Sequence, residues 1–185
     1  MNIIEIILNA LQLIINLDAI LYEIIFLSLK VSLSALIISS FLAIIIGYFL
    51  ALKKFFFKNS IFIFINSLMG IPPVVVGLIV YFFFAHGGPL GVFKLLYTPW
   101  AMIIAQIIII FPIVTSLSHE IFSQNWLQYR DQFRSLNMPF FGILRILIVH
   151  SYFLLITVLL SAFGRAISEV GAVMVVGGNI DHYTR

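Results

Sequence analysis

Two residues of opposite charge stand close together in an otherwise apolar stretch near the end of the chain. Arg165 and Glu169 are four residues apart, so on a helix their side chains can meet on one face. A charge at membrane depth is costly and usually faces the bundle interior or a water-filled cavity. The pair is either a structural ion pair, which the spacing favours, or a polar element at a gate. Gly171, Gly177 and Gly178 follow and would let this segment bend.

The residues that catalysis would require are not assembled in the sequence. His119-Glu120 begins like a zinc-binding HExxH pattern, but Ser123 stands where the second histidine would be. The chain has no GxxxxGK[ST] phosphate-binding loop, no GxSxG nucleophile elbow and no cysteine. Its basic residues are also too few for nucleic-acid binding. We expect no enzyme, no cofactor, no metal and no nucleic acid, with an intramembrane enzyme or a membrane scaffold as alternatives from other functional classes.

The composition identifies lipid as the solvent around most of the chain. Of its residues 63% are hydrophobic and only 9% charged, whereas about a quarter are charged in soluble domains. Runs such as IIAQIIIIF do not alternate in the way that strands of a membrane barrel do. The sequence therefore predicts an all-α, multi-pass transmembrane bundle in the cell membrane. Stretches of roughly 20 apolar residues can span the hydrocarbon, and four are present, at residues 31–52, 60–85, 96–117 and 146–163.

The basic residues predict how these spans are oriented. The loop after the first span and the loop between the third and fourth spans contain Lys53, Lys54, Lys58, Arg130, Arg134 and Arg145. By the positive-inside rule these two loops are cytoplasmic. The N-terminus, the loop at residues 86–96 and the C-terminal segment then lie outside.

Residues 1–23 differ from the rest of the chain. Polar residues recur there at three- and four-residue steps, which would place them on one side of a helix. These residues are Asn2, Glu5, Asn9, Gln12 and Asn16. We expect an amphipathic helix in the membrane interface or against the bundle, with a short additional span as the alternative. The membrane domain then covers residues 24–185.

The cytoplasmic loop at residues 118–145 contains the segment NWLQYRDQFRSLNMP, which predicts a short amphipathic helix that Pro139 stops. Its apolar side carries Trp126, Tyr129, Phe133 and Leu136. It is either an ordinary interfacial helix or a docking helix that inserts aromatic side chains into a cleft on a soluble partner. Periodicity alone does not separate these two interpretations.

The second span contains Gly70-Ile71-Pro72-Pro73. Adjacent prolines remove backbone donors and bend a helix, so the freed carbonyl groups must face protein or water. Gly70 and Gly77 would let another helix approach closely. The segment is either a packing kink or a broken helix that lines a transport pathway.

These segments together resemble the permease subunits of type I ATP-binding-cassette importers, in their tungstate and molybdate branch. The resemblance is carried by GIPPVVVGL (70–78), GGPLG (87–91) and GRAISEVGAVMVVGGNI with the later YTR (164–185). The ISEVGAV form of the last block is closer to tungstate permeases than to molybdate permeases. The family continues beyond this point into a further spanning helix, so we expect that span to be missing from this chain.

The resemblance implies a mechanism and a set of partners. Two copies of the permease form the pathway, an extracytoplasmic binding protein delivers tungstate, and separate ATPase subunits dock on the cytoplasmic loops; a molybdate or sulfate permease is the alternative. The family's docking pattern, EAA followed by a glycine, falls on Asp131, Gln132, Phe133 and Asn137, where only the acidic character of the first position is kept. The amphipathic form of the loop, on the expected side, makes docking the preferred interpretation.

Two sets of site residues follow. The docking candidates are Trp126, Tyr129, Arg130, Asp131, Phe133, Leu136 and Asn137. The pathway or gate candidates are Gly70, Pro72, Pro73, Gly77, Arg165, Glu169, Gly171, Gly177 and Gly178.

Overall fold

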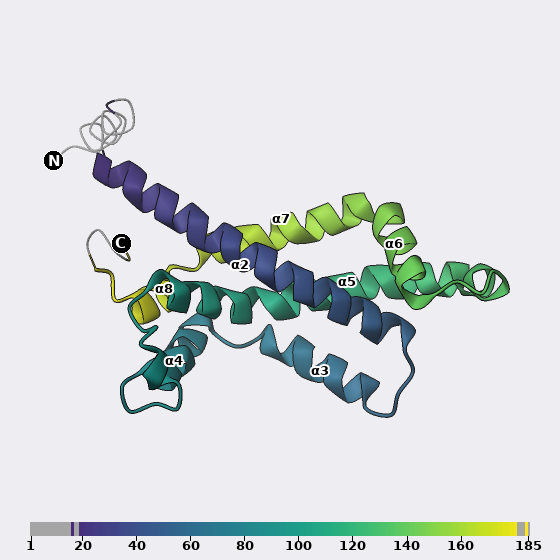
Figure 1. Ribbon diagram of the computed structural model, residues 1–185, viewed down its shortest axis with the longest axis horizontal. Helices are drawn as coiled ribbons and strands as arrows, with labels where there is room; N and C mark the ends of the chain where they lie inside the picture. Colours follow the sequence, from purple (N-terminus) through teal and green to yellow (C-terminus); the bar gives the residue numbers. More distant parts are fainter. Residues whose placement is uncertain (1–15, 17–18, 181–183, 185) are drawn as a thin grey trace.

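The computed structural model describes residue 16, residues 19–180 and residue 184, and these residues form helices and connecting turns without any strand. Figure 1 shows the elements, which are α2 (Ala19–Leu52), α3 (Lys58–Leu68), α4 (Pro73–Phe84), the 3₁₀ helix η1 (Gly91–Phe93), α5 (Pro99–Ser135), α6 (Phe140–His150), α7 (Tyr152–Ser168) and α8 (Val170–Gly177).

The predicted all-α membrane fold is confirmed. The amphipathic helix expected over residues 1–17 lies outside the described residues apart from Asn16. The expected domain boundary after residue 23 falls inside α2, which is continuous.

The central helix of the described chain is α5, which contacts each of the other α-helices. Its 37 residues correspond to about 55 Å at 1.5 Å per residue, well beyond the roughly 30 Å of the hydrocarbon layer. Its C-terminal end extends beyond the end of α2, at the right of Figure 1. The expected third span and the expected cytoplasmic loop helix are thus one continuous helix.

A stripe of small residues brings α2 and α5 together. Ser32, Ala35, Ser39, Ala43 and Gly47 follow one another at steps of three or four residues, and all five are buried. A Cβ atom added at Gly47 would lie 2.8 Å from the carbonyl oxygen of Thr115 on α5. Lipid tails are as apolar as leucine, so close backbone approach between small residues is a main source of helix association in membranes.

Two of the four expected spans are bent pairs of helices, whereas α2 and α5 are each long and apolar enough to cross alone. The axes of α3 and α4 differ by 100°, and the break falls where the sequence predicted it. Pro72 ends the break, and its carbonyl oxygen accepts the first hydrogen bond of α4, from the Val75 N–H at 2.9 Å.

The second bend, of 78° between α6 and α7, was not expected. The fourth span was expected to begin at residue 146, but α6 ends at His150 and a new direction begins at Tyr152. Ser151 between them is buried, and its Oγ accepts a hydrogen bond of 2.7 Å from Nδ2 of Asn125 on α5. Hydropathy is continuous across this point, so only the contact with α5 marks the bend.

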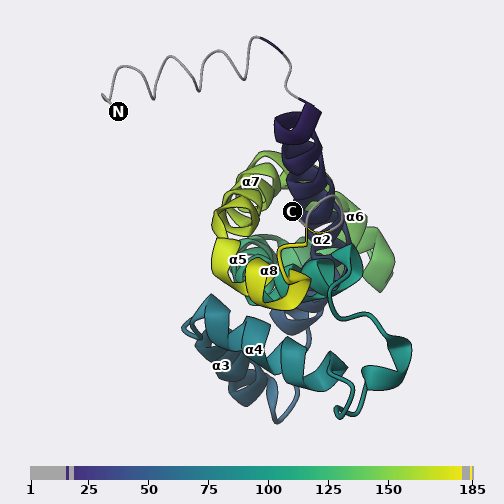
Figure 2. The ribbon, with the colours of Figure 1, turned by 90° about the vertical axis from the view of Figure 1, so that its left-hand side faces the viewer.

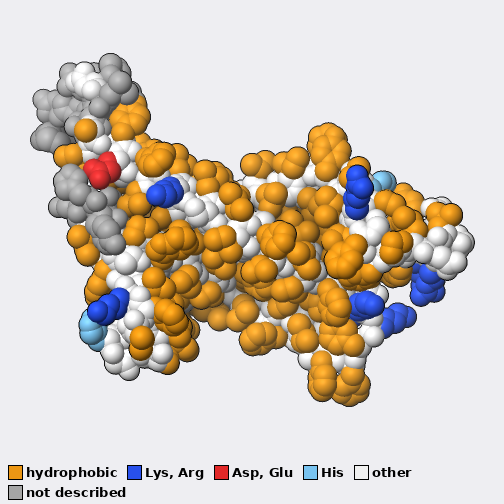
Figure 3. Space-filling view, in the orientation of Figure 1, with side chains coloured by type: hydrophobic (Ala, Val, Ile, Leu, Met, Phe, Trp, Pro, Cys, Tyr) orange, Lys and Arg blue, Asp and Glu red, His pale blue; other side chains and the backbone are white. Residues whose placement is uncertain are grey.

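The two ends of the molecule differ in charge. Seen from one end, α3 and α4 lie to one side of the group formed by α2, α5, α7 and α8 (Figure 2). The middle of the molecule is covered by apolar side chains, and Lys and Arg side chains gather at the end where α5 projects, at the right of Figure 3. Lys53 lies over the Phe140 ring, 5.2 Å from its centroid, and Arg134 shares a hollow with both residues. The fold thus joins the two basic loops that the sequence assigned to the cytoplasm.

Candidate functional site

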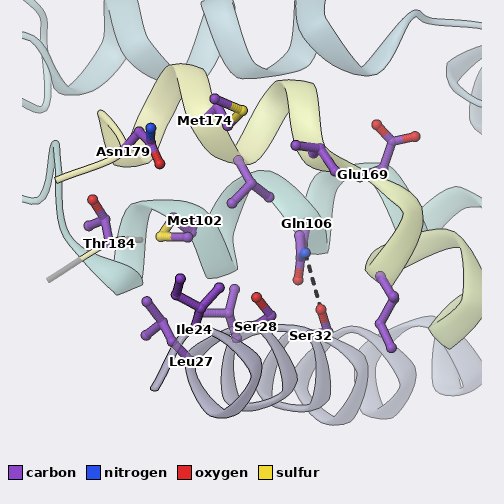
Figure 4. Close-up of a pocket in the computed structure, with 14 residues that line it drawn as sticks. Ile24, Leu27, Ser28, Ser32, Met102, Gln106, Glu169, Met174, Asn179 and Thr184 are labelled. Atoms are coloured by element: carbon purple, nitrogen blue, oxygen red, sulfur yellow. Dashed lines mark hydrogen bonds between the residues drawn. The ribbon is translucent and has the colours of Figure 1, made fainter. Parts of the chain in front are cut away.

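A cavity of about 200 Å³ lies between α2, α5 and α8 at the end opposite the basic cluster. Figure 4 shows Gln106 of α5 between α2 and the segment that begins α8. The polar residues around the cavity are Ser28, Ser32, Gln106, Glu169, Asn179 and Thr184. This cavity was not predicted, because its residues come from four separate parts of the sequence.

Gln106 ties three helices together beside this cavity. Its side chain is buried, and Nε2 donates to the carbonyl oxygen of Ala166 on α7 at 3.0 Å and to Oγ of Ser32 on α2 at 3.3 Å. Its Oε1 atom is also buried and has no hydrogen-bond partner among the described residues. With both donor hydrogens in use, Gln106 offers the cavity only an acceptor. Gln106 itself therefore provides no donor to an oxyanion in this cavity.

Arg165 and Glu169 form the ion pair that their spacing predicted. Nη2 of Arg165 lies 2.9 Å from Oε1 of Glu169, and the two side chains are 41% and 12% exposed. Glu169 stands at the junction where α7 ends and α8 begins, and its N–H donates to the carbonyl oxygen of Ala166 at 3.3 Å. The ion pair and the hydrogen bond from Gln106 to Ala166 therefore both stabilise the junction between α7 and α8. The arrangement agrees with a structural role for the pair, while the more exposed Arg165 is left accessible.

The exposed side of α7 carries a polar face that the sequence analysis missed. Thr157, Ser161, Gly164 and Ser168 are exposed on the helix that also carries Arg165. The hydroxyl groups of Thr157 and Ser161 donate to carbonyl oxygens of their own helix, four residues earlier. Nothing lies within 4 Å of a Cβ added at Gly164, so the face is open. The signal in the sequence was the recurrence of small polar residues at three- and four-residue steps.

The glycines proposed to bend a gate are mostly contact points between helices. A Cβ atom at Gly77 on α4 would lie 2.9 Å from Cα of Ala172 on α8, and one at Gly171 would lie 3.0 Å from a methyl group of Val74. Gly177 packs in the same way on Met102 of α5. These glycines let α8 fit against α4 and α5 at close range. Among the pathway candidates, Gly70, Pro72 and Pro73 form or flank the α3–α4 break.

Gly178 ends α8 in the left-handed conformation, with φ of 74°. A Cβ atom there would lie 2.5 Å from the Tyr97 ring. The Tyr97 N–H donates to the carbonyl oxygen of Val176 at 3.0 Å, which joins the loop before α5 to the end of α8. Gly178 is therefore needed for both its backbone conformation and its lack of a side chain.

At the cytoplasmic end, the aromatic residues of the expected docking helix pack within the chain. The rings of Trp126 and Phe133 are stacked, and Tyr129 meets His150 edge to face. Phe133 is only 8% exposed, in an apolar cluster with Ile143 and Leu147 of α6. The expectation that Phe133 inserts into a partner is therefore wrong, because α6 folds back and covers it. Periodicity identified the apolar side of the helix correctly but not what covers it.

The residues of this segment that remain available to a partner are at its exposed side and its tip. Arg130 and Asp131 are exposed and lie 3.5 Å apart. Leu127 and Leu136 are 68% and 70% exposed. Leu127 was not among the docking candidates.

Asn137 has a specific backbone role at the tip of α5. It has a positive φ of 46°, and its N–H donates to the carbonyl oxygen of Arg134, while the Met138 N–H donates to that of Phe133. These two bonds are those of a Schellman motif, which ends a helix with a left-handed residue that is usually glycine and sometimes asparagine. The resemblance to importer permeases placed a glycine at this position. The departure from the family's pattern therefore keeps the backbone conformation that the glycine provides.

Comparison with known proteins gives a family match over most of the chain. Residues 43–183 match the family described as "Binding-protein-dependent transport system inner membrane component". The matched region runs from the middle of α2 through α8 and includes both bent helix pairs.

Individual relatives agree with the family match. The chain is 38% identical over 176 residues to the tungstate uptake system permease protein TupB of Peptoclostridium acidaminophilum, covering 95% of this chain and 77% of that one. It is 38% identical over 160 residues to the "Probable anion ABC transporter permease protein" of Haloferax volcanii, covering 86% and 69%. It is 35% identical over 128 residues to the tungstate uptake system permease protein TupB of Campylobacter jejuni, covering 69% and 54%.

Proposed function

The chain belongs to the family of binding-protein-dependent transport system inner membrane components, and from that premise we propose that it forms part of the translocation pathway for tungstate. As a member of this family it is a multi-pass permease subunit of an ABC importer for an oxyanion, and not itself an enzyme. Family membership also implies an ATPase and a binding protein as partners.

The names of two relatives support tungstate as the substrate, since both are tungstate uptake permeases. This similarity is the observation on which the choice of anion rests. Tungstate, molybdate and sulfate are tetrahedral dianions of similar shape, and molybdate and sulfate are the alternatives. Selection among them would then lie with the extracytoplasmic binding protein, and the permease would provide only a polar route.

The polar face of α7 supports a pathway between two copies of this chain. A dianion cannot cross hydrocarbon without compensation for its charge, so the route must be lined by polar groups or water. In a single copy the face of Thr157, Ser161 and Ser168 would lie against lipid, beside the partly exposed Arg165. Pairing two copies across this face would enclose the polar side chains and place Arg165 where it can attract an anion.

The projecting end of α5 supports an ATPase-docking role for the cytoplasmic segment. It combines exposed Leu127 and Leu136 with the exposed charges of Arg130 and Asp131. Trp126 and Phe133 support this surface from the inner side of the helix, because their rings pack on each other and on α6. A rigid surface with apolar contacts and a charged margin suits a permanent partner subunit.

An uptake experiment tests the proposed substrate. Cells that carry the complete transport system, with and without this subunit, are given tungstate, molybdate or sulfate, and metal or sulfur uptake is measured by mass spectrometry. We expect uptake of tungstate to depend on this subunit and to persist against an excess of sulfate. Uptake that follows molybdate or sulfate instead would overturn the choice of anion, and uptake unaffected by loss of the subunit would overturn its role in the pathway.

A further inference from the structure

Helix α6 has apolar residues on two opposite sides. Ile143 and Leu147 face the interior and are buried in the cluster that also contains Phe133. Phe141 and Val149, on another side of the helix, are 77% and 67% exposed. An amphipathic helix at a protein surface would carry polar residues there, so the outer side of α6 is suited to contact with apolar material outside the chain.

The direction of α6 suits a position along the surface of the membrane. Its axis is turned by 78° from that of α7, which continues the span into the bundle. A helix nearly perpendicular to a spanning helix lies close to the membrane plane, at the level where lipid headgroups meet acyl chains. α6 also lies at the end where the basic side chains gather.

A groove of about 590 Å³ runs along the outer side of α6, lined by Met138, Gly142, Arg145, Ile146, Val149 and His150. Gly142 has no side chain to fill it, and its other walls are mainly apolar. Arg145 is exposed and forms no ion pair with an acidic residue of the described chain. Asp131 of α5 lies within 3.5 Å of Arg130. The groove thus joins apolar walls to a guanidinium group without an anionic partner.

We propose that this groove binds one anionic phospholipid, with the phosphate on Arg145 and an acyl chain along Ile146 and Val149. A guanidinium group presents several N–H donors in a planar arrangement that matches phosphate oxygens. Basic residues beside a spanning helix are attracted to anionic lipid, by about 1 kcal/mol each, or roughly a fivefold change in affinity. A zwitterionic lipid carries its own ammonium group and gains less from the surrounding basic residues.

Native mass spectrometry of the detergent-purified chain, alone and within the complete transporter, tests this site with phosphatidylglycerol and phosphatidylcholine. We expect the wild type to retain phosphatidylglycerol preferentially and Arg145→Gln to bind it about fivefold more weakly, with Arg145→Lys in between. Val149→Ser should also weaken binding without a change of charge. Lys54→Gln is the matched control, since Lys54 is exposed at the same end but does not line the groove. Inorganic phosphate at equal concentration should not displace the lipid.

Several results would overturn the proposal. If Arg145→Gln and Lys54→Gln lost phosphatidylglycerol binding equally, the lipid would be attracted to the whole basic end and not to the groove. Unchanged binding of phosphatidylglycerol to Arg145→Gln, or retention of phosphatidylcholine equal to that of phosphatidylglycerol, would contradict the proposed site. Binding to the isolated chain that disappears in the complete transporter would identify the groove as a protein contact.

Discussion

Gly77 on α4 lies directly against Ala172 on α8, so that a Cβ atom at Gly77 would be 2.9 Å from the Ala172 Cα. Both residues are buried. The contact joins the helix that follows the proline break to the helix that follows the Arg165–Glu169 junction. Two segments that carry the resemblance to importer permeases are therefore packed on each other. The two helices can lie this close because Gly77 has no side-chain methyl group.

Gly77→Ala should destabilise the chain by about 1–3 kcal/mol, because the added methyl group meets backbone atoms that cannot move aside. The measurement is thermal unfolding of the purified chain in detergent, followed by intrinsic fluorescence. Gly164→Ala is the matched control. It adds the same methyl group to a helical glycine with nothing within 4 Å, and should leave stability unchanged or raise it by up to about 1 kcal/mol. Equal melting temperatures for the two variants would contradict the close α4–α8 contact.

Asn137→Gly should be at least as stable as the wild type, whereas Asn137→Ala should lose about 1 kcal/mol. The reason is the positive φ of 46° at this position, which glycine adopts freely and alanine does not. The same thermal assay measures both variants. If alanine were tolerated as well as glycine, the left-handed end of α5 would not be required.

Leu136→Asp should leave the chain folded but prevent copurification of the ATPase subunit, because Leu136 is 70% exposed. Phe133→Asp should instead prevent folding, since it places a charge in the apolar cluster beneath α6. Size-exclusion chromatography separates the two effects, and copurification is scored only for folded protein. Full retention of the ATPase by Leu136→Asp would exclude this tip from the docking surface.

Arg165→Gln should lower tungstate uptake several-fold and reduce stability only slightly. Arg165 is 41% exposed, and an ion pair of that exposure contributes less than about 1 kcal/mol. The double variant Arg165→Gln with Glu169→Gln should recover the stability, because no unpaired carboxylate remains beside the cavity. Uptake should stay low in the double variant if Arg165 also attracts the anion. Recovery of uptake together with stability would assign the pair a structural role alone.

Several features could be predicted because they depend on local chemistry. Pro72 and Pro73 both lack backbone donors, so two adjacent prolines disfavour an unbroken helix, and the α3–α4 bend lies there. Arg165 and Glu169 stand four residues apart and form the pair that this spacing allows. Composition alone assigned the chain to lipid, since too few charged residues are present to cover a surface in water.

Other features depended on partners that are distant in the sequence. The α6–α7 bend lies at Ser151, where Asn125 of α5 donates to the serine hydroxyl group. The cavity beside Gln106 exists only where α2, α5 and α8 meet. The polar face of α7 could have been found from its spacing, but whether that face was buried could not.

The sequence by itself determined that the solvent is hydrocarbon, that the chain breaks at Pro72 and Pro73, and that Arg165 and Glu169 can pair. The tertiary structure decided which apolar faces are covered by protein, as with Phe133 beneath α6, and which glycines are contacts between helices. The physical reason is that an apolar side chain is nearly as stable against lipid as against another helix. Hydropathy therefore identifies a membrane helix without indicating its inner side, which is set by the fit of small residues such as Gly77 and Ala172.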